Sequence, residues 1–173
     1  ASGVGLAAIQ FAKTMGAEVI TTIDSPEKAA FVKKLGADYV LDYRTEDVRP
    51  VIEQHNPTVA LDCIGGKLMG ECFKNMVFGG RWIMIATMAG AETVINLETV
   101  WRKRIRLIGS TLRSRTPEEK AHILHCLETE LWPLFSQRKL ISNIHAVFPI
   151  REVEKAHGFL RRAENIGKVV LTF

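Results

Sequence analysis

The sequence predicts an α/β fold built on a doubly wound parallel sheet. Apolar strand-like segments alternate with helical segments along the 173 residues, and little linker separates them. The strand-like segments are short and continuously apolar, as in sheets that helices cover on both faces. A glycine turn, Gly3-Val4-Gly5, opens the first helix. These three observations together define the fold class, and each element can be justified in order.

The first three elements carry clear start and stop signals. A helix is expected over Gly5–Met15, because apolar side chains recur there at helical spacing and Gly16 follows. The strand expected over Glu18–Asp24 is rich in β-branched residues. The next helix begins at Ser25-Pro26, an N-cap residue followed by proline at the first helical position, and runs to Gly36.

The same alternation continues through the middle of the chain. Strands are expected at Asp38–Tyr43, Thr58–Gly65, Arg81–Thr87 and Ile105–Thr111. Helices are expected at Thr45–His55, Lys67–Phe78 and Leu97–Lys103. Since a helix separates each strand from the next, neighbouring strands should run parallel.

The last third of the chain changes character. A long helix is expected over Pro117–Gln137, and a strand over Ile144–Pro149 follows it. A further helix over Arg151–Ala163 leads to a final strand over Gly167–Phe173. No repeat is visible beyond the strand–helix unit itself.

The glycine turn indicates a nucleotide-binding site. Gly3 to Ala8 matches G-x-G-x-x-A, and Asp24 lies at about the distance expected of an acid that binds a ribose. Glycines at a helix start let backbone N–H groups approach a pyrophosphate, and the helix dipole favours the negative charge. A central strand should precede this turn. We therefore expect a Rossmann-like sheet that lacks its first strand, through truncation or because a partner chain supplies it.

Composition and charge favour a cytoplasmic protein without a metal site. No apolar run approaches the length of about 18 residues that spans a membrane. The three cysteines match neither a zinc pattern nor a disulfide framework, which favours a reducing compartment. His122 and His125 lie three residues apart on a helix without an evident third ligand, so we assign no metal. The net charge of +4 suits phosphorylated ligands better than nucleic acid.

Six motifs in order resemble a known family. They are ASGVGLAAIQ, LGADYVLDYR, LDCIGG, GGRWIMI, GSTLRSR and IGKVVLTF. Together they resemble the zinc-independent NADPH:quinone oxidoreductases of the medium-chain dehydrogenase/reductase superfamily. The resemblance implies a nucleotide-binding domain over residues 1–143 and a catalytic domain of GroES-like fold before Ala1. Residues 144–173 would be the segment that returns to that catalytic domain.

The resemblance also refines the glycine turn and extends the site. The family pattern Gly-Ala-Ser-Gly-Val-Gly aligns so that Ser2 replaces a glycine and Gly5 becomes the position of close packing. It implies cofactor contacts from loops that end successive strands. The expected cofactor-binding residues of the turn and of these loops are Ser2, Gly3, Val4, Gly5, Ile64, Ile85, Met88, Ser110, Thr111 and Leu112. Each loop residue also fits a plain turn.

The choice of nicotinamide cofactor depends on four side chains, of which Lys28, Tyr43 and Arg44 favour the 2′-phosphate of NADP. Asp24, at the end of the second strand of such a fold, favours the ribose 2′-OH of NAD. In the resembling family, Lys and Tyr at the positions of Lys28 and Tyr43 hold the 2′-phosphate of NADP, and a glycine usually replaces the acid. We predict NADP(H) as the cofactor, with Asp24, Lys28 and Tyr43 among its ligands.

The predicted function is the transfer of reducing equivalents from NADPH to a quinone or a related activated carbonyl. Hydride transfer from a nicotinamide needs positioning more than acid–base groups, so no catalytic residue is assigned, and the chain alone is expected to be inactive. An alcohol dehydrogenase or enoyl reductase is an alternative within the same class. A non-catalytic nucleotide- or RNA-binding module is a second alternative, supported only by the basic run Arg102–Arg106. The resemblance implies a homodimer formed through the edge strand Ile105–Ser110.

Overall fold

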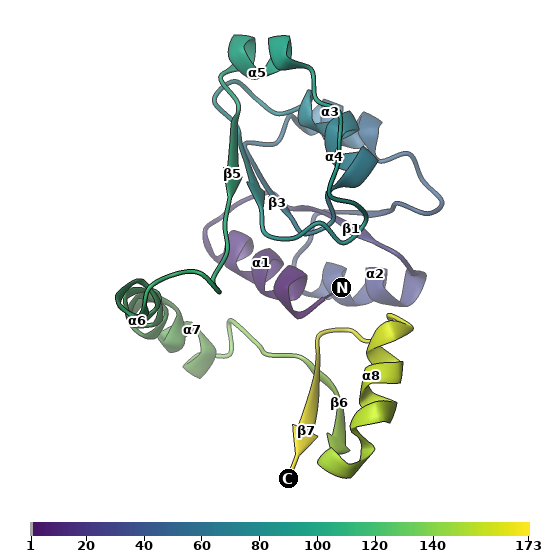
Figure 1. The fold of residues 1–173 in the computed structure, drawn as a ribbon, viewed down its shortest axis with the longest axis vertical. Helices are drawn as coiled ribbons and strands as arrows, with labels where there is room; N and C mark the ends of the chain where they lie inside the picture. Colours follow the sequence, from purple (N-terminus) through teal and green to yellow (C-terminus); the bar gives the residue numbers. More distant parts are fainter. Residues whose placement is uncertain (1) are drawn as a thin grey trace. The chain divides into compact units, whose positions relative to one another are not determined.

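The computed structural model describes residues 2–173 as two compact units (Figure 1). Ala1, with which the predicted nucleotide-binding domain begins, lies outside the described residues. The first unit combines the chain up to Glu46 with His125–Phe173, and the second comprises Asp47–Leu124. The domain boundary expected between residues 143 and 144 stays a prediction.

The N-terminal half of the first unit is a helix–strand–helix–strand segment. It consists of α1 (Gly3–Thr14), β1 (Ile20–Ile23), α2 (Pro26–Lys34) and β2 (Tyr39–Asp42). The strands pair in parallel, with Ile20 opposite Tyr39 and Ile23 opposite Asp42. Apolar side chains from both helices, from β1 and from the residues just before each strand form one buried cluster, which comprises Leu6, Ile9, Val19, Ile23, Val32 and Ala37. Burial of this cluster fixes α1 and α2 against the strand pair.

The C-terminal half of the first unit is a second parallel strand pair with one helix. It contains β6 (Ile144–Pro149), a 3-10 turn η2 (Ile150–Glu152), α8 (Val153–Arg161) and β7 (Lys168–Thr172). The ring of Phe159 on α8 lies 5.3 Å from that of His145 and 6.2 Å from that of Phe148. These ring contacts hold α8 against β6.

The second unit contains a three-stranded parallel sheet in the order β3-β4-β5. Its strands are β3 (Val59–Asp62), β4 (Arg81–Met84) and β5 (Arg106–Gly109), and its helices include α3 (Arg49–His55), α4 (Gly66–Phe73) and α5 (Leu97–Lys103). Phe73 of α4 is 1% exposed, and its ring lies 5.7 Å from that of Trp82 on β4. This contact anchors α4 to the sheet.

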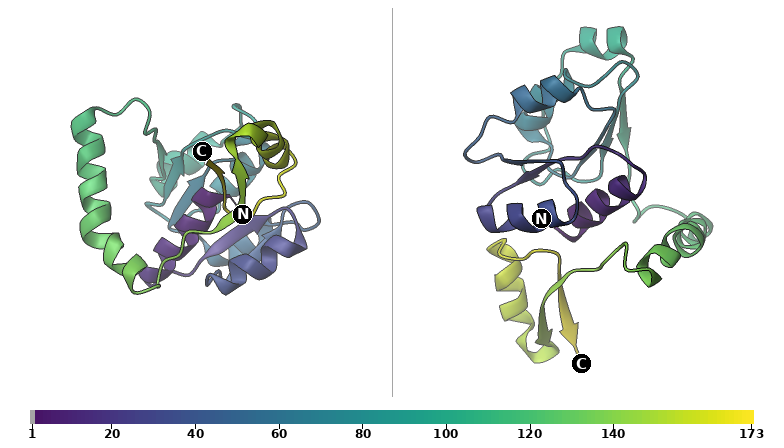
Figure 2. Two further views of the ribbon diagram at one scale, coloured as in Figure 1. Left: turned by 90° about the horizontal axis from the view of Figure 1, so that it is seen from below. Right: turned by 180° about the vertical axis from the view of Figure 1, so that it is seen from behind.

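The long helix expected over Pro117–Gln137 is present but irregular (Figure 2). It consists of α6 (Pro117–Cys126), a π-helical turn η1 (Leu127–Leu131) and α7 (Trp132–Ser136). Pro133 lacks an N–H and therefore cannot donate to the carbonyl of Thr129, so the α-helical ladder is interrupted there. The Thr129 hydroxyl instead donates to the carbonyl of His125 at 2.9 Å.

The expected parallel α/β architecture is confirmed, because every strand pair in the described residues runs parallel. One helix start is wrong: the helix expected from Thr45 begins at Arg49. Asp42 and Glu46 instead close a turn, in which the N–H of Asp42 donates to Glu46 Oε1 at 3.0 Å and the N–H of Glu46 to the carbonyl of Asp42 at 2.8 Å.

Several expected elements are shorter in the structure. The helix predicted to reach Phe78 ends at Phe73, and the strand predicted over Thr58–Gly65 ends at Asp62. The Asp62 carboxylate accepts the N–H groups of Ile64 and Gly65, so it turns the chain away from the sheet. Across residues 2–173, none of the helices has the length and apolar composition needed to traverse a bilayer.

Candidate functional site

The N-terminus of α1 is capped by the serine of the glycine turn. Ser2 has extended backbone geometry, and its Oγ accepts the N–H of Gly5 at 3.1 Å. Its carbonyl accepts the N–H of Leu6 at 2.9 Å. Gly3 and Val4 occupy the first turn, where helix geometry leaves N–H groups without intrahelical acceptors. The predicted residues Ser2, Gly3, Val4 and Gly5 therefore form one continuous helix start with positive potential.

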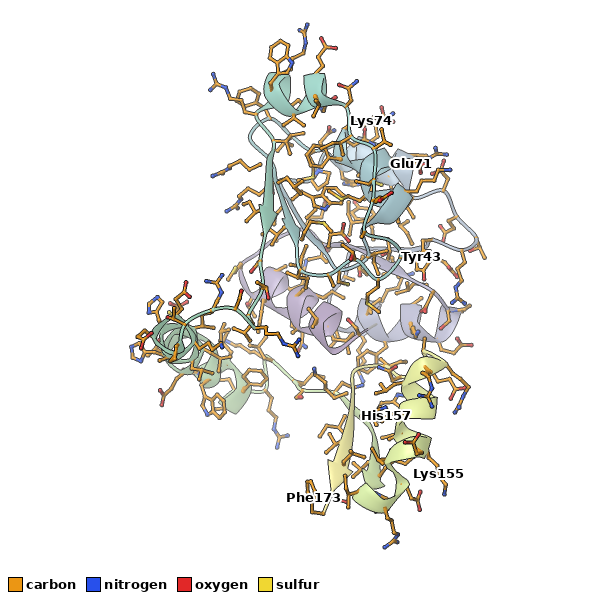
Figure 3. All side chains as sticks on the ribbon, in the orientation of Figure 1. Tyr43, Glu71, Lys74, Lys155, His157 and Phe173 are labelled. Carbon is orange, nitrogen blue, oxygen red and sulfur yellow. The ribbon has the colours of Figure 1, made fainter. Side chains whose placement is uncertain are left out.

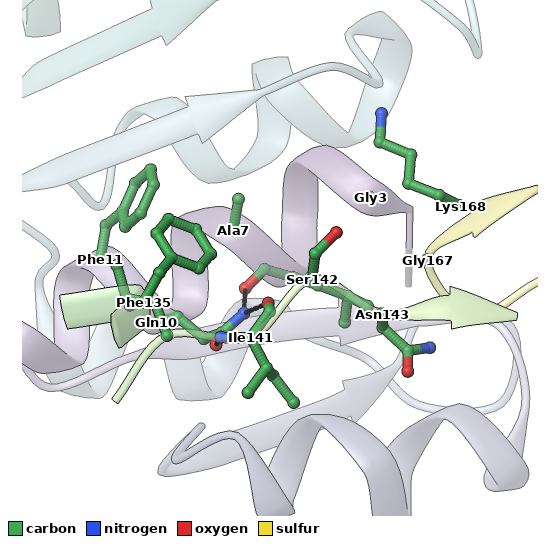
Figure 4. Close-up of a pocket in the computed structure, with 12 residues that line it drawn as sticks. Gly3, Ala7, Gln10, Phe11, Phe135, Ile141, Ser142, Asn143, Gly167 and Lys168 are labelled. Atoms are coloured by element: carbon green, nitrogen blue, oxygen red, sulfur yellow. Dashed lines mark hydrogen bonds between the residues drawn. The ribbon is translucent and has the colours of Figure 1, made fainter. Parts of the chain in front are cut away.

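A lysine from the last strand lies against this helix start (Figure 4). Ser2 forms a parallel bridge with Gly167, which places Lys168 beside Gly3. A β-carbon built on Gly3 would lie 2.6 Å from Cε of Lys168, so glycine leaves the room that the lysine chain occupies. The motif IGKVVLTF contains Gly167-Lys168, but on the sequence alone these two residues are only a weak candidate for the cofactor site. The position of Lys168 at the glycine turn depends on pairing between segments that are distant in the sequence.

Behind the helix start lies a small cavity of about 160 Å³, seen in Figure 4. Phe11 and Phe135 line one side of it, and Lys168 belongs to its rim. Gln10 crosses the cavity and joins α1 to Ile141: its Nε2 donates to the Ile141 carbonyl at 3.1 Å, and its Oε1 accepts the Ile141 N–H at 2.8 Å. This amide pair fixes the segment that leads into β6.

The carboxyl end of β1 holds the predicted ribose-binding acid in an ion pair. Lys28 Nζ lies 2.6 Å from Asp24 Oδ1, and the side chain of Lys28 is only 7% exposed. Lys28 Nζ also donates to the carbonyl of Ala163 at 2.7 Å. Of the two predicted ligands, Asp24 remains 17% exposed at its side chain, whereas Lys28 is buried between α2 and the chain that follows α8.

Two further side chains flank this pair. Arg44 Nη2 lies 3.8 Å from Asp24 Oδ2, and the arginine side chain is 60% exposed. Tyr43, labelled in Figure 3, is 45% exposed, and its N–H donates to the carbonyl of Ile23 at 3.2 Å. Asp24, Lys28 and Tyr43 therefore lie at the carboxyl ends of β1 and β2, where doubly wound sheets bind ligands.

Asp24 is ionised at neutral pH. Burial alone would raise the pKa of this carboxyl, but the hydrogen bond from Lys28 and its positive charge outweigh burial and lower the pKa below 3.8. Arg44 contributes in the same direction. The site therefore presents a fixed negative charge.

Only some of the predicted loop residues of the second unit lie on loops that contact each other. The N–H of Met88 donates to the carbonyl of Cys63 at 3.1 Å, and the N–H of Ala89 to that of Ile64 at 2.8 Å. These bonds join the loops after β3 and β4, so Ile64 and Met88 lie on adjacent loops. Met88 is 79% exposed. Ile85 continues the β4 ladder, since its N–H donates to the carbonyl of Asp62 at 2.9 Å.

The loop after β5 contains the last predicted contacts. The N–H of Ser110 donates to the carbonyl of Met84 at 2.9 Å, so Ser110 still belongs to the ladder with β4. Thr111 and Leu112 follow it, and Leu112 is 60% exposed. Burial raises the pKa of the nearby Cys63 thiol, and the negative charge of Asp62 adds to this, so Cys63 is a neutral thiol at pH 7.

A comparison with protein families identifies the chain. Residues 3–129 match the model of the zinc-binding dehydrogenase family. The chain belongs to the zinc-binding dehydrogenase family. This places it in the medium-chain dehydrogenase/reductase superfamily, which the sequence motifs had indicated.

Relatives and solved structures agree with this assignment. The chain is 30% identical to the quinone oxidoreductase of Pseudomonas aeruginosa over 99% of its own length and 54% of that protein. It matches the crystal structure of Escherichia coli quinone oxidoreductase complexed with NADPH with a TM-score of 0.82, at 26% identity, over 100% of this chain and 55% of that one. A crystal structure described as an NAD-dependent alcohol dehydrogenase matches with a TM-score of 0.78, at 27% identity, over 99% of this chain and 48% of that one. The chain spans about half the length of the curated relatives it matches.

The family name refers to zinc, but the described part of this chain contains no cluster of three or more His, Cys, Asp or Glu side chains that could hold a metal ion. What the described part does contain is two groups of charged side chains and backbone polar atoms in the first unit. One is the α1 start with Lys168, and the other is the pair Asp24–Lys28 with Ala163.

Proposed function

We propose that the chain is the cofactor-binding part of an oxidoreductase that passes reducing equivalents from a nicotinamide dinucleotide to a quinone or a related activated carbonyl. NADPH is the donor predicted from the sequence. The cofactor would supply the hydride chemistry. The chain's own residues bind the cofactor and orient it. The quinone oxidoreductases of P. aeruginosa and E. coli support this choice of substrate class.

The observation that supports the proposal most is the α1 start with Lys168. Exposed N–H groups, the helix dipole and a lysine converge there, which suits the two negative charges of a pyrophosphate. A β-carbon at Gly5 would make only an ordinary contact, 3.5 Å from Ser2 Oγ. Within the described residues there is therefore room beside Gly5, which the cofactor or the strand expected before the turn would fill.

Replacement of Lys168 tests the proposal. We expect Lys168→Met to weaken NADH and NADPH binding by about tenfold each, the effect of losing one charge-assisted hydrogen bond. Lys155→Met is the matched control, because Lys155 is a 71% exposed lysine on α8 of the same unit. Fluorescence titration of the nicotinamide measures both. Equal affinities in all three proteins would contradict the proposed pyrophosphate site.

The substrate is tested with the whole reductase that contains this chain. We expect oxidation of the reduced nicotinamide to depend on an added quinone, and enone and alcohol substrates assayed in parallel distinguish the alternative activities. The cytoplasm remains the proposed compartment, since Cys63, Cys72 and Cys126 form no disulfide with one another, as in reducing compartments.

We further propose that two copies of the chain pair through β5. This strand bonds to β4 on one side within the described sheet, and Leu107 and Ile108 are 48% and 37% exposed. An exposed apolar edge strand readily pairs with another strand. Light scattering should give a dimer mass for the wild type and a monomer mass for Leu107→Lys. A monomeric wild type would exclude this pairing.

A further inference from the structure

The loop 163–167, between α8 and β7, leads directly into Lys168 and is held by two residues at the start of β6. The N–H of Lys168 donates to the carbonyl of Asn143 at 2.8 Å, and the side-chain amide of Asn143 donates to the carbonyl of Ile166. On the other side of the same residue, the N–H of Ile166 donates to Nδ1 of His145 at 3.1 Å. Gly167 between them has a φ of 92°, and a β-carbon there would clash with the Asn143 carbonyl. The backbone that carries the lysine is therefore positioned by β6.

A β-bulge gives His145 its direction. Ile144 lies opposite Lys168 and Ala146 opposite Val169, so β6 has one residue more than β7 at this point, and that residue is His145. A bulge takes its extra residue out of the ladder and re-aims the side chain, and bulges are over-represented next to functional sites. The imidazole packs 5.3 Å from the ring of Phe159, measured between ring centroids, and its Nδ1 reaches the loop.

The bond between His145 and Ile166 requires a neutral imidazole. A ring nitrogen accepts an N–H only while it is unprotonated, so the proton of the neutral ring belongs on Nε2. Protonation of Nδ1 would place two donors face to face and break the bond. Histidine is the side chain that ordinarily changes charge between about pH 5 and pH 8, and His145 is exposed to solvent. The contact that holds the loop is therefore sensitive to mild acid.

The elements packed around the imidazole carry several other charged or titratable groups. They are Glu154, Lys155, His157, Arg161 and Arg162 on and after α8, Glu164 in the loop, and Lys168 on β7. Lys155 pairs with Glu152 at 3.2 Å, and Arg162 Nε lies 2.6 Å from Glu164 Oε1. The hydrogen bond from Arg162 lowers the pKa of Glu164, so that carboxylate stays ionised in mild acid. Lysine and arginine side chains also keep their charge there. This leaves the two histidines, and of these His145 is bonded to the loop.

We propose that His145 is a positioning residue of the dinucleotide site and makes its affinity depend on pH. The neutral imidazole fixes the loop so that Lys168 lies at the α1 start, and protonation frees the loop, so the pyrophosphate loses its cation. The inference rests on the proposed function and predicts weaker dinucleotide binding in acid. The positive charge that His145 gains would by itself strengthen the binding of an anion. The sign of the pH dependence therefore separates a positioning role from a purely electrostatic one.

The test measures the affinities of the whole reductase that contains this chain for NAD⁺ and NADP⁺, by isothermal titration calorimetry at about pH 8 and about pH 5.5. His145→Asn places an oxygen that does not titrate near the position of Nδ1, whereas His145→Phe keeps the ring contact with Phe159 and lacks the acceptor. Lys168→Met removes the cation itself. His157→Gln is the matched control, because this exposed histidine of α8, labelled in Figure 3, lies two residues from Phe159 and so on another face of the helix.

We expect the wild type to lose about fivefold to tenfold in affinity for both dinucleotides at the lower pH, and His157→Gln to lose as much. His145→Asn should bind like the wild type at the higher pH and change little in acid. His145→Phe and Lys168→Met should bind weakly at both. A wild-type affinity that is constant or rises in acid would overturn the inference and leave the proposed function intact, as would an unchanged pH dependence in Lys168→Met.

A reductase that binds neither dinucleotide at the higher pH would reject the proposed function and the inference with it. If a His145 variant fails to fold, the wild type, Lys168→Met and His157→Gln still decide the question, because the inference requires a pH dependence that needs Lys168 and not His157.

Discussion

The ion pair between Asp24 and Lys28 belongs to the predicted cofactor site and also contributes to the stability of the fold. Because the pKa of Asp24 is lower in the folded state than the ordinary value of 3.8, the pair stabilises the fold above that pH. As the pH falls through the folded-state pKa, the carboxyl protonates and this contribution is lost.

The free energy of unfolding should therefore decrease below about pH 4, and Asp24→Asn should remove part of that decrease. Urea unfolding of both proteins between about pH 6 and about pH 3, a range that brackets the ordinary carboxyl pKa, measures the difference in their free energies of unfolding. Parallel stability profiles for the two proteins would show that the ion pair contributes nothing to folding.

Gln10 is the second residue whose removal should be costly. It is 7% exposed and makes three hydrogen bonds, two of them to the backbone of Ile141 and one to the carbonyl of Leu6. Gln10→Ala leaves the N–H and carbonyl of Ile141 without these partners, and we expect it to lower the free energy of unfolding by about 2 kcal/mol. Gln10→Glu keeps the acceptor but loses the donor, so its thermal unfolding temperature should lie between those of the wild type and Gln10→Ala.

The sequence identified the ionisable residues of the site but not their partners. Asp24 and Lys28 stand four residues apart, a spacing that itself suggests an ion pair. The carbonyl of Ala163 and the backbone of Ile141 are more than a hundred residues away from their partners. Such contacts depend on tertiary packing, and no local pattern around Lys28 or Gln10 encodes them.

Among the elements, the turn from β3 to α4 depends most on one side chain. Asp62 accepts the N–H groups of Ile64 and Gly65 and the indole N–H of Trp82 at 3.0 Å. We expect Asp62→Ala to cost about 3 kcal/mol, because two buried donors and one half-buried donor lose their acceptor. Trp82 fluorescence during urea unfolding reports the change directly. Asp62→Asn retains one acceptor oxygen and should cost less; an equal cost would mean that the charge matters more than the hydrogen bonds.

Element boundaries were predictable where caps are local. The helix Leu97–Lys103 has the predicted bounds, and Asn96 Oδ1 accepts the N–H of Thr99 at its start. The strand Ile144–Pro149 also has its predicted bounds. The helix expected from Thr45 was wrong because the Asp42–Glu46 turn competes for the same residues. Asx turns and caps use the same residue types, so the sequence alone does not separate them.

At the scale of the whole molecule, the RNA-binding alternative depends on whether the basic run Arg102–Arg106 is available to a nucleic acid. Arg102 pairs with Glu98 at 2.7 Å, Lys103 donates to the carbonyls of Lys74 and Met76, and Arg104 stacks over the ring of Phe78. Much of this charge is therefore engaged within the second unit. We expect no RNA retention at physiological salt and no difference after Arg104→Gln, as measured by filter binding. Retention that falls steeply with salt and is lost in this variant would favour the alternative.

The fold class was predictable at this scale because strand–helix alternation is a property of the whole chain. Parallel pairing follows from it without knowledge of any particular contact. The start of α1 was likewise predictable, because the glycine turn Gly3-Val4-Gly5 marks it in the sequence. Lys168 was only a weak candidate from the sequence, because its position at the α1 start depends on the Ser2–Gly167 bridge.

That bridge also constrains the order in which the protein matures. Ser2 and Gly167 are far apart in the sequence, so the ribosome must synthesise the whole segment between them before they can make contact. Until then the α1 start has its serine cap and its dipole but lacks the lysine. A nascent chain can thus form its helices and local strand pairs early, while its anion-binding end is completed last, since distant pairings form slowly.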